Sequence, residues 1–249
     1  MTASMNVQSA SALTDARPRW RPAFDAPLAT HLYLPFSLLL IANAWLVGGG
    51  GDFWFADELY RLEGGHWALQ HAWLTHQLIH GAGKWLSQLA VLGVLFATLR
   101  AWRAVQPQRW AWLALLASVA VSTGLVSLLK HVTHMDCPWD LARYGGTQAF
   151  YGLLESRHGI PASGCFPAGH ASAGYAWLAL YFFALAVAPR WRWPAFALAL
   201  SVGLLFGLSQ QLRGAHFLSH DLWTLAICWC VPLFFFRLLP QADFPPVQA

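Results

Sequence analysis

Residues 165–172 read Cys-Phe-Pro-Ala-Gly-His-Ala-Ser, and a long apolar run follows them directly. Pro167 and Gly169 favour a turn, whereas the small and apolar residues from Ala171 onward favour a helix. His170 would then lie in the first helical turn, where unpaired N–H groups and the positive end of the helix dipole attract phosphate. An imidazole at this place can also transfer protons near neutral pH. Because such turns are common in proteins, their meaning here depends on Lys130 and on residues 213–221.

The chain carries few charges for its length. Of its 249 residues, 57% are hydrophobic and 10% are charged, whereas a soluble domain has about 25% charged residues. A water-soluble protein of this size could not bury so much apolar surface, but a protein within a bilayer need not. We therefore expect an integral membrane protein. The basic residues are scattered beside apolar runs, so the sequence pI of about 9.1 does not indicate a nucleic-acid partner.

Several apolar runs are long enough to cross a bilayer, which predicts an all-α, polytopic bundle of about six transmembrane helices. The polar residues 1–30 are expected to form a cytoplasmic tail without a cleavable signal peptide. Residues 31–240 would form one membrane domain, and residues 241–249 a second tail. The expected spans cover roughly residues 32–48, 86–99, 110–129, 171–188, 193–212 and 217–236.

The distribution of charge predicts the orientation of these spans. Six spans place both termini on one side, which would hold nine of the 15 Lys and Arg residues but only three of the 11 acidic residues. Because loops rich in Lys and Arg remain in the cytoplasm, both termini are expected to be cytoplasmic. Residues 50–80, 130–169 and 213–216 would then share the outer face. We expect a bacterial inner membrane with this face in the periplasm, and a eukaryotic membrane is the alternative.

Histidines are frequent in the first outer segment, among many aromatic residues. Trp and His at this density are typical of a helix that lies at the membrane surface. His76 and His80 are four residues apart and could lie on one helical face as metal ligands, but the sequence places no third ligand. We therefore favour interfacial structure over a metal site.

Two histidines and two cations are expected to meet on the outer face. Lys130 ends the third span, and His170 and His216 lie near helix starts. Arg213 lies one helical turn before His216, and Arg can hold phosphate oxygens in a bidentate fork. One imidazole could attack phosphorus while the other protonates the leaving oxygen. This set predicts phosphoryl transfer that requires no metal or other cofactor.

The pattern resembles the membrane branch of the type-2 phosphatidic acid phosphatase and vanadium haloperoxidase superfamily. That family has three motifs: Lys, six residues, Arg-Pro; then Pro-Ser-Gly-His; then Ser-Arg, five residues, His, three residues, Asp. The order, spacing and six-span frame match over roughly residues 85–237. In this chain the motifs read Lys130, six residues, Cys137-Pro138; Pro167-Ala168-Gly169-His170; and Ser209-Gln210, five residues, His216, three residues, His220.

The resemblance implies a membrane phosphatase that acts on a lipid phosphate or diphosphate at the outer leaflet. His216 would be the nucleophile that forms a phosphohistidine, and His170 would be the acid that then activates water. Lys130 and Arg213 would bind the phosphate, with help from the N–H groups of Gly169 and His170. Phosphatidate, phosphatidylglycerol phosphate, polyprenyl diphosphate and lipid A phosphates are all compatible substrates. The alternatives are a lipid phosphotransferase and a catalytically silent relative that binds anionic headgroups.

Four motif positions depart from the family pattern. Cys137 and Gln210 replace arginines, Ala168 replaces the serine, and His220 replaces the final aspartate. Arg143 and Arg213 are nearby candidates to restore the positive charge.

The family's aspartate orients the nucleophilic histidine by accepting its ring N–H. A neutral His220 could accept that hydrogen bond, because it follows His216 by about one helical turn. If the helix begins only after His216, Asp221 could serve instead, so both residues remain candidates.

The first two motifs each bring a cysteine to the outer face, where disulfides persist. We predict a disulfide between Cys137 and Cys165 that ties together the ends of the long outer loop. This bond would explain why a cysteine is tolerated where the family has arginine. Cys228 and Cys230 lie two residues apart in the sixth span and are expected to be packing residues.

Overall fold

The computed structural model describes residues 26–73, 75, 81, 83–153, 155 and 163–239. The two predicted tails lie mostly outside these residues. Within them the chain is mainly helical and contains no strand, and six helical segments are long and apolar enough to cross a membrane. The predicted all-α fold with about six spans is therefore confirmed. The segments are Ala29–Gly48, Trp85–Arg103, Arg109–Asp140, Gly169–Val187, Pro189–Gln211 and Leu218–Arg237.

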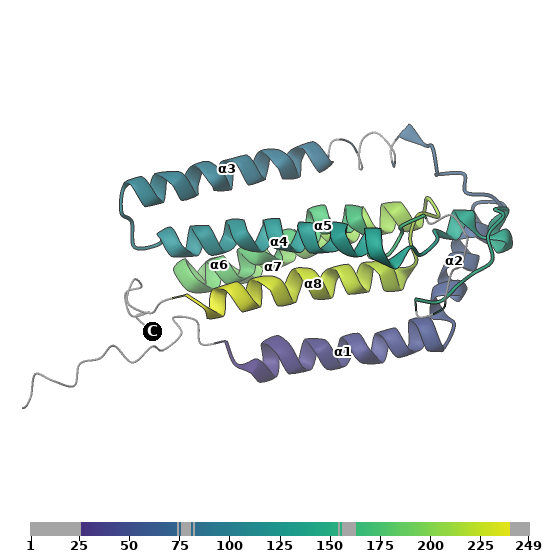
Figure 1. The fold of residues 1–249 in the computed structure, drawn as a ribbon, viewed down its shortest axis with the longest axis horizontal. Coiled ribbons are helices and arrows are strands. Elements are labelled where there is room, and N and C mark those ends of the chain that lie inside the picture. Colours follow the sequence, from purple (N-terminus) through teal and green to yellow (C-terminus); the bar gives the residue numbers. More distant parts are fainter. Residues whose placement is uncertain are drawn as a thin grey trace, which may run out of the picture.

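Eight α-helices build the described part of the chain (Figure 1). Wider, π-type turns extend the first helix at both ends, and the 3₁₀ turn Ala176–Leu178 joins the fifth helix to the sixth. The helices are α1 (Leu34–Asn43), α2 (Gly51–Leu62), α3 (Gly83–Arg103), α4 (Arg109–Thr133), α5 (Gly169–Tyr175), α6 (Ala179–Val187), α7 (Arg192–Gln211) and α8 (Leu218–Arg237).

The third span extends further than its apolar residues predict. α4 continues to Thr133, so Lys130 lies on its last turn rather than just beyond the helix. His134 follows with a left-handed backbone, at a φ of 52°, a conformation that often ends helices. A helix end can include Lys130 because a long lysine side chain can carry its ammonium group toward polar surroundings.

Glycines allow the inner helices to approach each other closely. A Cβ atom on Gly174 of α5 would lie 2.6 Å from the Cα atom of Gly203 on α7. A Cβ atom on Gly203 would lie 2.0 Å from the ring of Tyr175. Since atoms cannot approach so closely, only glycine fits at these two crossings. The α5–α7 contact thereby fixes the end of α5 against α7.

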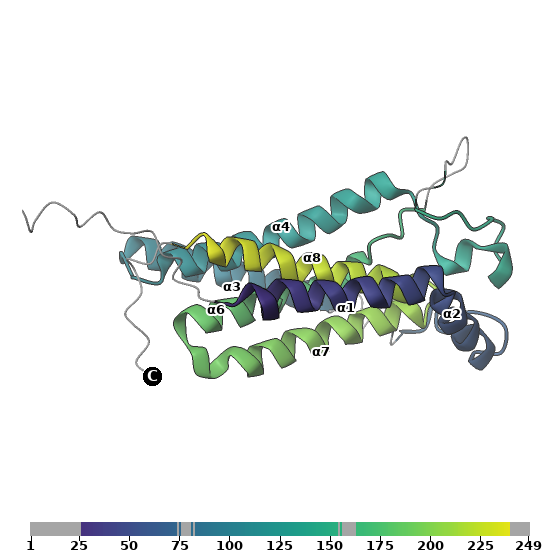
Figure 2. The same ribbon diagram turned by 90° about the horizontal axis from the view of Figure 1, so that it is seen from below.

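α1 and α3 run along opposite sides of the bundle (Figures 1 and 2). Many of their large apolar side chains are exposed, among them Ile41, Leu89 and Phe96. In a soluble protein such surfaces would be unfavourable, but acyl chains can cover them. The buried core instead lies where α4, α6 and α8 meet, around Leu115 and Phe182.

α2, residues 63–73 that follow it and the loop before α5 form a cap over one end of the bundle (Figure 1). This end is called the α2 end below. Asp57 of α2 accepts hydrogen bonds from Arg143 and from the Tyr144 hydroxyl. Tyr144 also packs with the rings of Tyr60 and Trp67. These contacts attach α2 to the long loop. Both α2 and the loop also pack against the segment that carries the third motif.

Two contacts join the cap to that third-motif segment. A Cβ atom on Gly214, which has a φ of 69°, would lie 2.4 Å from the Trp67 ring. At the start of α8, Asp52 Oδ1 accepts a 2.8 Å hydrogen bond from the Ser219 N–H. The cap therefore contacts the chain on both sides of His216.

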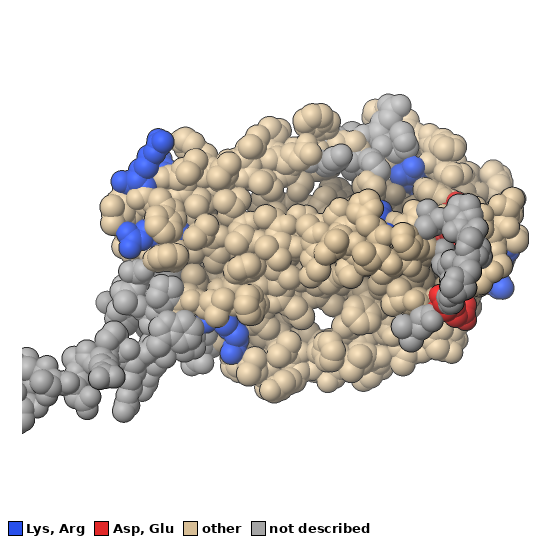
Figure 3. All heavy atoms as spheres, viewed as in Figure 1, with Lys and Arg blue, Asp and Glu red and all other residues tan. Residues whose placement is uncertain are grey.

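The two ends of the bundle differ in charge (Figure 3). Acidic residues gather at the α2 end, which includes Asp52, Asp57 and Glu58. Arginines gather at the opposite end, in the α3–α4 and α6–α7 connections and at the end of α8: Arg100, Arg103, Arg109, Arg190, Arg192 and Arg237.

Candidate active site

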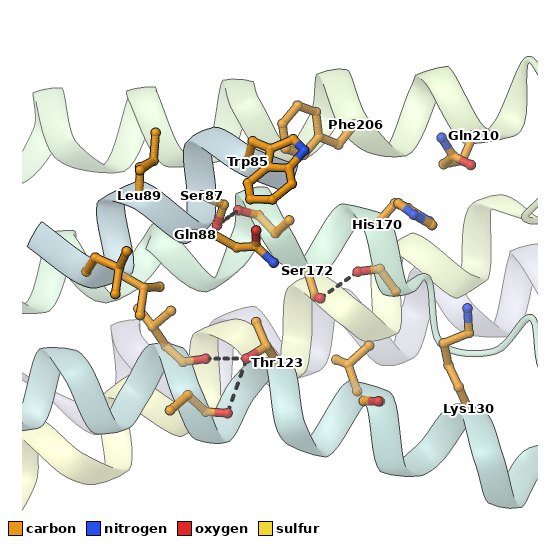
Figure 4. A pocket seen from close by; sticks show the side chains of 18 of the residues that line it. Trp85, Ser87, Gln88, Leu89, Thr123, Lys130, His170, Ser172, Phe206 and Gln210 are labelled. Carbon is orange, nitrogen blue, oxygen red and sulfur yellow. Dashed lines mark hydrogen bonds between the residues drawn. The ribbon is translucent and has the colours of Figure 1, made fainter. Parts of the chain in front are cut away.

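Three segments that are distant in the sequence meet at the α2 end of the bundle. Lys130 comes from the last turn of α4, His170 from the first turn of α5, and His216 from the turn between α7 and α8. Lys130 and His170 line a cavity of about 770 Å³, together with Gly169, Ser209 and Gln210. Figure 4 shows Lys130, His170 and Gln210 at the same end of this cavity.

Lys130 reaches across the start of α5. A Cβ atom on Gly169 would lie 3.1 Å from Lys130 Cδ and 3.3 Å from its Nζ, so glycine leaves room for the lysine side chain. No carboxylate forms an ion pair with Lys130 among the described residues. The ammonium group is therefore available to an anion within the cavity.

His216 is buried at the centre of the third-motif segment, with 4% of its surface exposed. Its pKa lies well below the usual value of 6.5, mainly because burial disfavours the charged imidazolium. Positive charge on His220, Lys130 and His170 lowers it further, whereas the Cys165 carbonyl acts in the opposite direction. His216 is therefore neutral at physiological pH, which is the state that a nucleophile requires.

His220 is the nearer of the two residues that were candidates to orient His216. It is fully buried, and its ring centroid lies 5.8 Å from that of His216. Neither of its ring nitrogens makes a well-aligned hydrogen bond to another described residue, although the Cys165 backbone lies close to the ring. Such buried nitrogens are costly unless a partner is present in the working state.

Asp221 faces a different helix. Its Oδ2 accepts a 2.5 Å hydrogen bond from Gln211 Nε2, and a Cβ atom on Gly207 would lie 2.0 Å from the same oxygen. The carboxyl group thus packs against α7. The structure brings His220, and not Asp221, beside His216.

The structure places the two candidate arginines differently. Arg213 is buried behind the cavity, where its Nε donates to the Gln70 carbonyl at 2.9 Å and its Nη1 donates to Gln210 Oε1 at 3.0 Å. Arg143 pairs instead with Asp57 of α2 and does not line the cavity. This contact raises the pKa of Arg143 and lowers that of Asp57.

Cys137 and Cys165 are joined by a disulfide that spans 28 positions, with Cα atoms 5.3 Å apart. The Cys165 N–H also donates to the Met135 carbonyl at 2.8 Å, and Thr133 Oγ1 donates to the Phe166 carbonyl at 2.5 Å. These bonds hold the end of the first motif beside the start of the second.

Some contributors were not identified from the sequence. Asp52, which binds the start of α8, lies 167 positions from its partner, and no local pattern marks that pairing. Gln210 was noted only as a departure, yet it lines the cavity and accepts the Arg213 hydrogen bond. The proposed interfacial histidines His76 and His80 lie outside the described residues.

Comparison with known proteins supports the assignment by motif. No curated protein and no solved structure matches the chain. A family model described as the PAP2 superfamily matches residues 111–243, which include all three motifs and more than half of the chain. The chain therefore belongs to the type-2 phosphatidic acid phosphatase superfamily.

Proposed function

We propose that this protein is an integral membrane phosphatase that hydrolyses a lipid phosphate or diphosphate through a phosphohistidine on His216. The observation that carries the proposal is that Lys130 and His170, which line one end of the cavity, lie close enough to the buried His216 for their charges to lower its pKa, while His216 itself lies just outside the cavity lining. The cavity is also lined by apolar residues such as Leu92 and Val119. A lipid chain could lie against these residues while its phosphate lies beside Lys130.

The reaction would have two steps. In the first, a ring nitrogen of His216 attacks phosphorus, and the bond to the lipid oxygen breaks as His170 donates a proton to that oxygen. In the second, His170 accepts a proton from water, which attacks phosphorus and releases phosphate from His216. Lys130 compensates the negative charge of the phosphoryl oxygens throughout.

His220 would act as the positioning residue for the nucleophile. A neutral His220 can accept a ring N–H of His216 after a small rotation, since their centroids are 5.8 Å apart. Such a bond would hold the His216 tautomer that leaves its other nitrogen free to attack. Gly169 would provide space and a backbone N–H, and Arg213 would act through Gln210.

The proposed site faces the outer leaflet of the membrane. This orientation is supported by the arginines at one end of the bundle and the acidic residues at the other (Figure 3), because Arg-rich loops remain in the cytoplasm. In a bacterial inner membrane the cavity would open toward the periplasm, where a Cys137–Cys165 disulfide persists.

The test is phosphate release by detergent-purified protein from a panel of lipid phosphates and diphosphates, with a metal chelator present. His216→Ala should abolish release, whereas His66→Ala is the matched control because His66 lies on the exposed side of the cap. Isolation of an acid-labile phosphoprotein from the wild type, but not from His216→Ala, would support the covalent step. Folded wild-type protein that releases phosphate from none of these lipids would contradict the proposal and favour a silent, headgroup-binding relative.

A further inference from the structure

The cavity is poor in permanent positive charge. Among the side chains that the structure describes, Lys130 is the one Lys or Arg that lines it, and no carboxylate lines it. The remaining polar groups near the phosphate end are neutral, chiefly Ser172, Ser209 and Gln210. Besides the proton that His170 donates, a bound phosphoryl group would therefore meet one permanent positive charge among the described side chains, that of Lys130.

Both motif arginines that could have added charge are replaced, and neither replacement restores it inside the cavity. Cys137 is held in the disulfide with Cys165. Gln210 presents a neutral amide, and Arg213 lies behind it with its Nε and Nη1 bonded to protein oxygens. Arg143 is paired with Asp57 in the cap.

The small number of positive charges in the cavity matters more as the reaction proceeds. Once His170 has given its proton to the leaving oxygen, Lys130 is the one permanent cation among the described cavity-lining side chains that remains for the phosphoryl group on His216. A phosphoryl group derived from a monoester then carries two negative charges, whereas one derived from a diester carries one. A partly buried site stabilises an ion well only when the opposite charge matches it.

We propose that the site is selective for a phosphoryl group with a single negative charge. This inference rests on the proposed phosphohistidine chemistry and specifies its substrate. Two kinds of lipid provide such a group: a lipid phosphodiester, and a phosphomonoester that retains one proton. With a diester, His216 bonds to phosphorus, diacylglycerol leaves with the proton of His170, and water then releases the headgroup phosphate from His216.

The two sources can be compared through one product. Phosphatidylglycerol and phosphatidate both yield diacylglycerol when the bond from phosphorus to the lipid oxygen breaks, so one mass-spectrometric assay measures both rates. Since the second pKa of a phosphomonoester is about 6, the singly charged form of phosphatidate falls about fifty-fold between about pH 6 and about pH 8. The rate ratio of phosphatidate to phosphatidylglycerol should fall by about the same factor.

Because both rates are measured with the same enzyme, the effects of pH on the enzyme's own groups cancel in this ratio. The titratable groups around the proposed phosphoryl site are Lys130 of α4, His170 of α5, His216 of the α7–α8 turn and, behind His216, His220 of α8. Their protonation affects both substrates together. A ratio that stays constant or rises between the two pH values would overturn the inference. Absence of diacylglycerol from both substrates, with His216→Ala indistinguishable from the wild type, would instead contradict the proposed function.

Gln210→Arg tests the same point through the protein. An arginine at the cavity wall should raise the rate on phosphatidate at about pH 8 by about tenfold relative to phosphatidylglycerol, since a charge-assisted hydrogen bond contributes enough for that change. Gln106→Arg is the matched control, because Gln106 lies in the α3–α4 connection at the far end of the bundle. An unchanged ratio in folded Gln210→Arg would contradict the proposal. If this variant does not fold, the wild-type ratio alone decides.

Discussion

Asp52 links the cap to the third-motif segment, and its replacement should show how much that link contributes to the stability of the protein. Asp52 is 8% exposed and accepts the N–H of Ser219, which is 4% exposed, at the start of α8. Asp52→Ala would leave this N–H buried without a partner, at a cost of about 1–3 kcal/mol. Asp52→Asn keeps an oxygen that can accept the bond, so its cost should be well below that of alanine.

The pH dependence separates the charge of Asp52 from its hydrogen bond. Burial raises the pKa of this carboxyl above its usual value of 3.8, although hydrogen bonds from Ser219 and Leu218 act in the opposite direction. The folded state therefore holds the proton more tightly than the unfolded state does. The corresponding stability is present below the usual pKa and is lost as pH rises through the folded value. Because asparagine does not titrate, Asp52→Asn should gain stability relative to the wild type over that pH range.

Thermal unfolding in detergent, followed at several pH values, measures both effects. For a chain of this size a change of 1 kcal/mol corresponds to about 2–4 °C, so Asp52→Ala should lower the Tm by several degrees. Equal stability of Asp52→Ala and the wild type would show that the bond to Ser219 does not support α8. A constant difference between Asp52→Asn and the wild type at all pH values would refute the assigned pKa shift.

Four further outcomes are expected. His216→Ala should lower the rate of phosphate release by at least about 10²-fold, whereas His220→Asp should retain more activity than His220→Leu; equal rates for the last two would exclude a positioning role. Reduction of the Cys137–Cys165 disulfide should lower stability by about 3–4 kcal/mol in the chain-entropy account of a loop of this length, and free thiols at both positions in non-reducing mass mapping would contradict the bond. Arg143→Ala should change stability by less than about 1 kcal/mol, because its ion pair with Asp57 is exposed, and should leave KM unchanged. Lys130→Ala should raise KM and lower kcat, and unchanged kinetics would remove Lys130 from the site.

Much of the fold follows from local properties of the chain. Apolar runs such as 110–129 require a bilayer or a core whatever their neighbours are, so the six spans could be predicted from their length and composition. Helix ends were less predictable, because α4 continues beyond Lys130 to Thr133. A charged residue ends an apolar run in the sequence. It does not have to end the helix, because a long side chain such as that of Lys130 can extend from the helix toward polar surroundings.

The candidate site was predictable to the extent that its residues occur in motifs. Lys130, His170 and His216 could be proposed together because their spacing resembles that of a known family, and the match over residues 111–243 supports the family. The choice between His220 and Asp221 was different, since both are compatible with the spacing. It depends on where α8 begins and on which neighbouring helix each side chain meets.

The sequence by itself determined that this is a membrane protein of six apolar spans and that its two motif histidines lie close to helix starts, because hydrophobicity and local turn signals act over short distances. Only the tertiary structure decided which cations reach the cavity. Arg143 and Arg213 are both candidates by position, with Arg213 favoured, but Asp57 draws Arg143 into the cap, and the Gln70 carbonyl and Gln210 bind Arg213 outside the cavity lining. These partners are up to 143 positions away in the sequence. The position of an arginine side chain depends on the acceptor oxygens that lie near it in space, and these cannot be read from its neighbours in the chain.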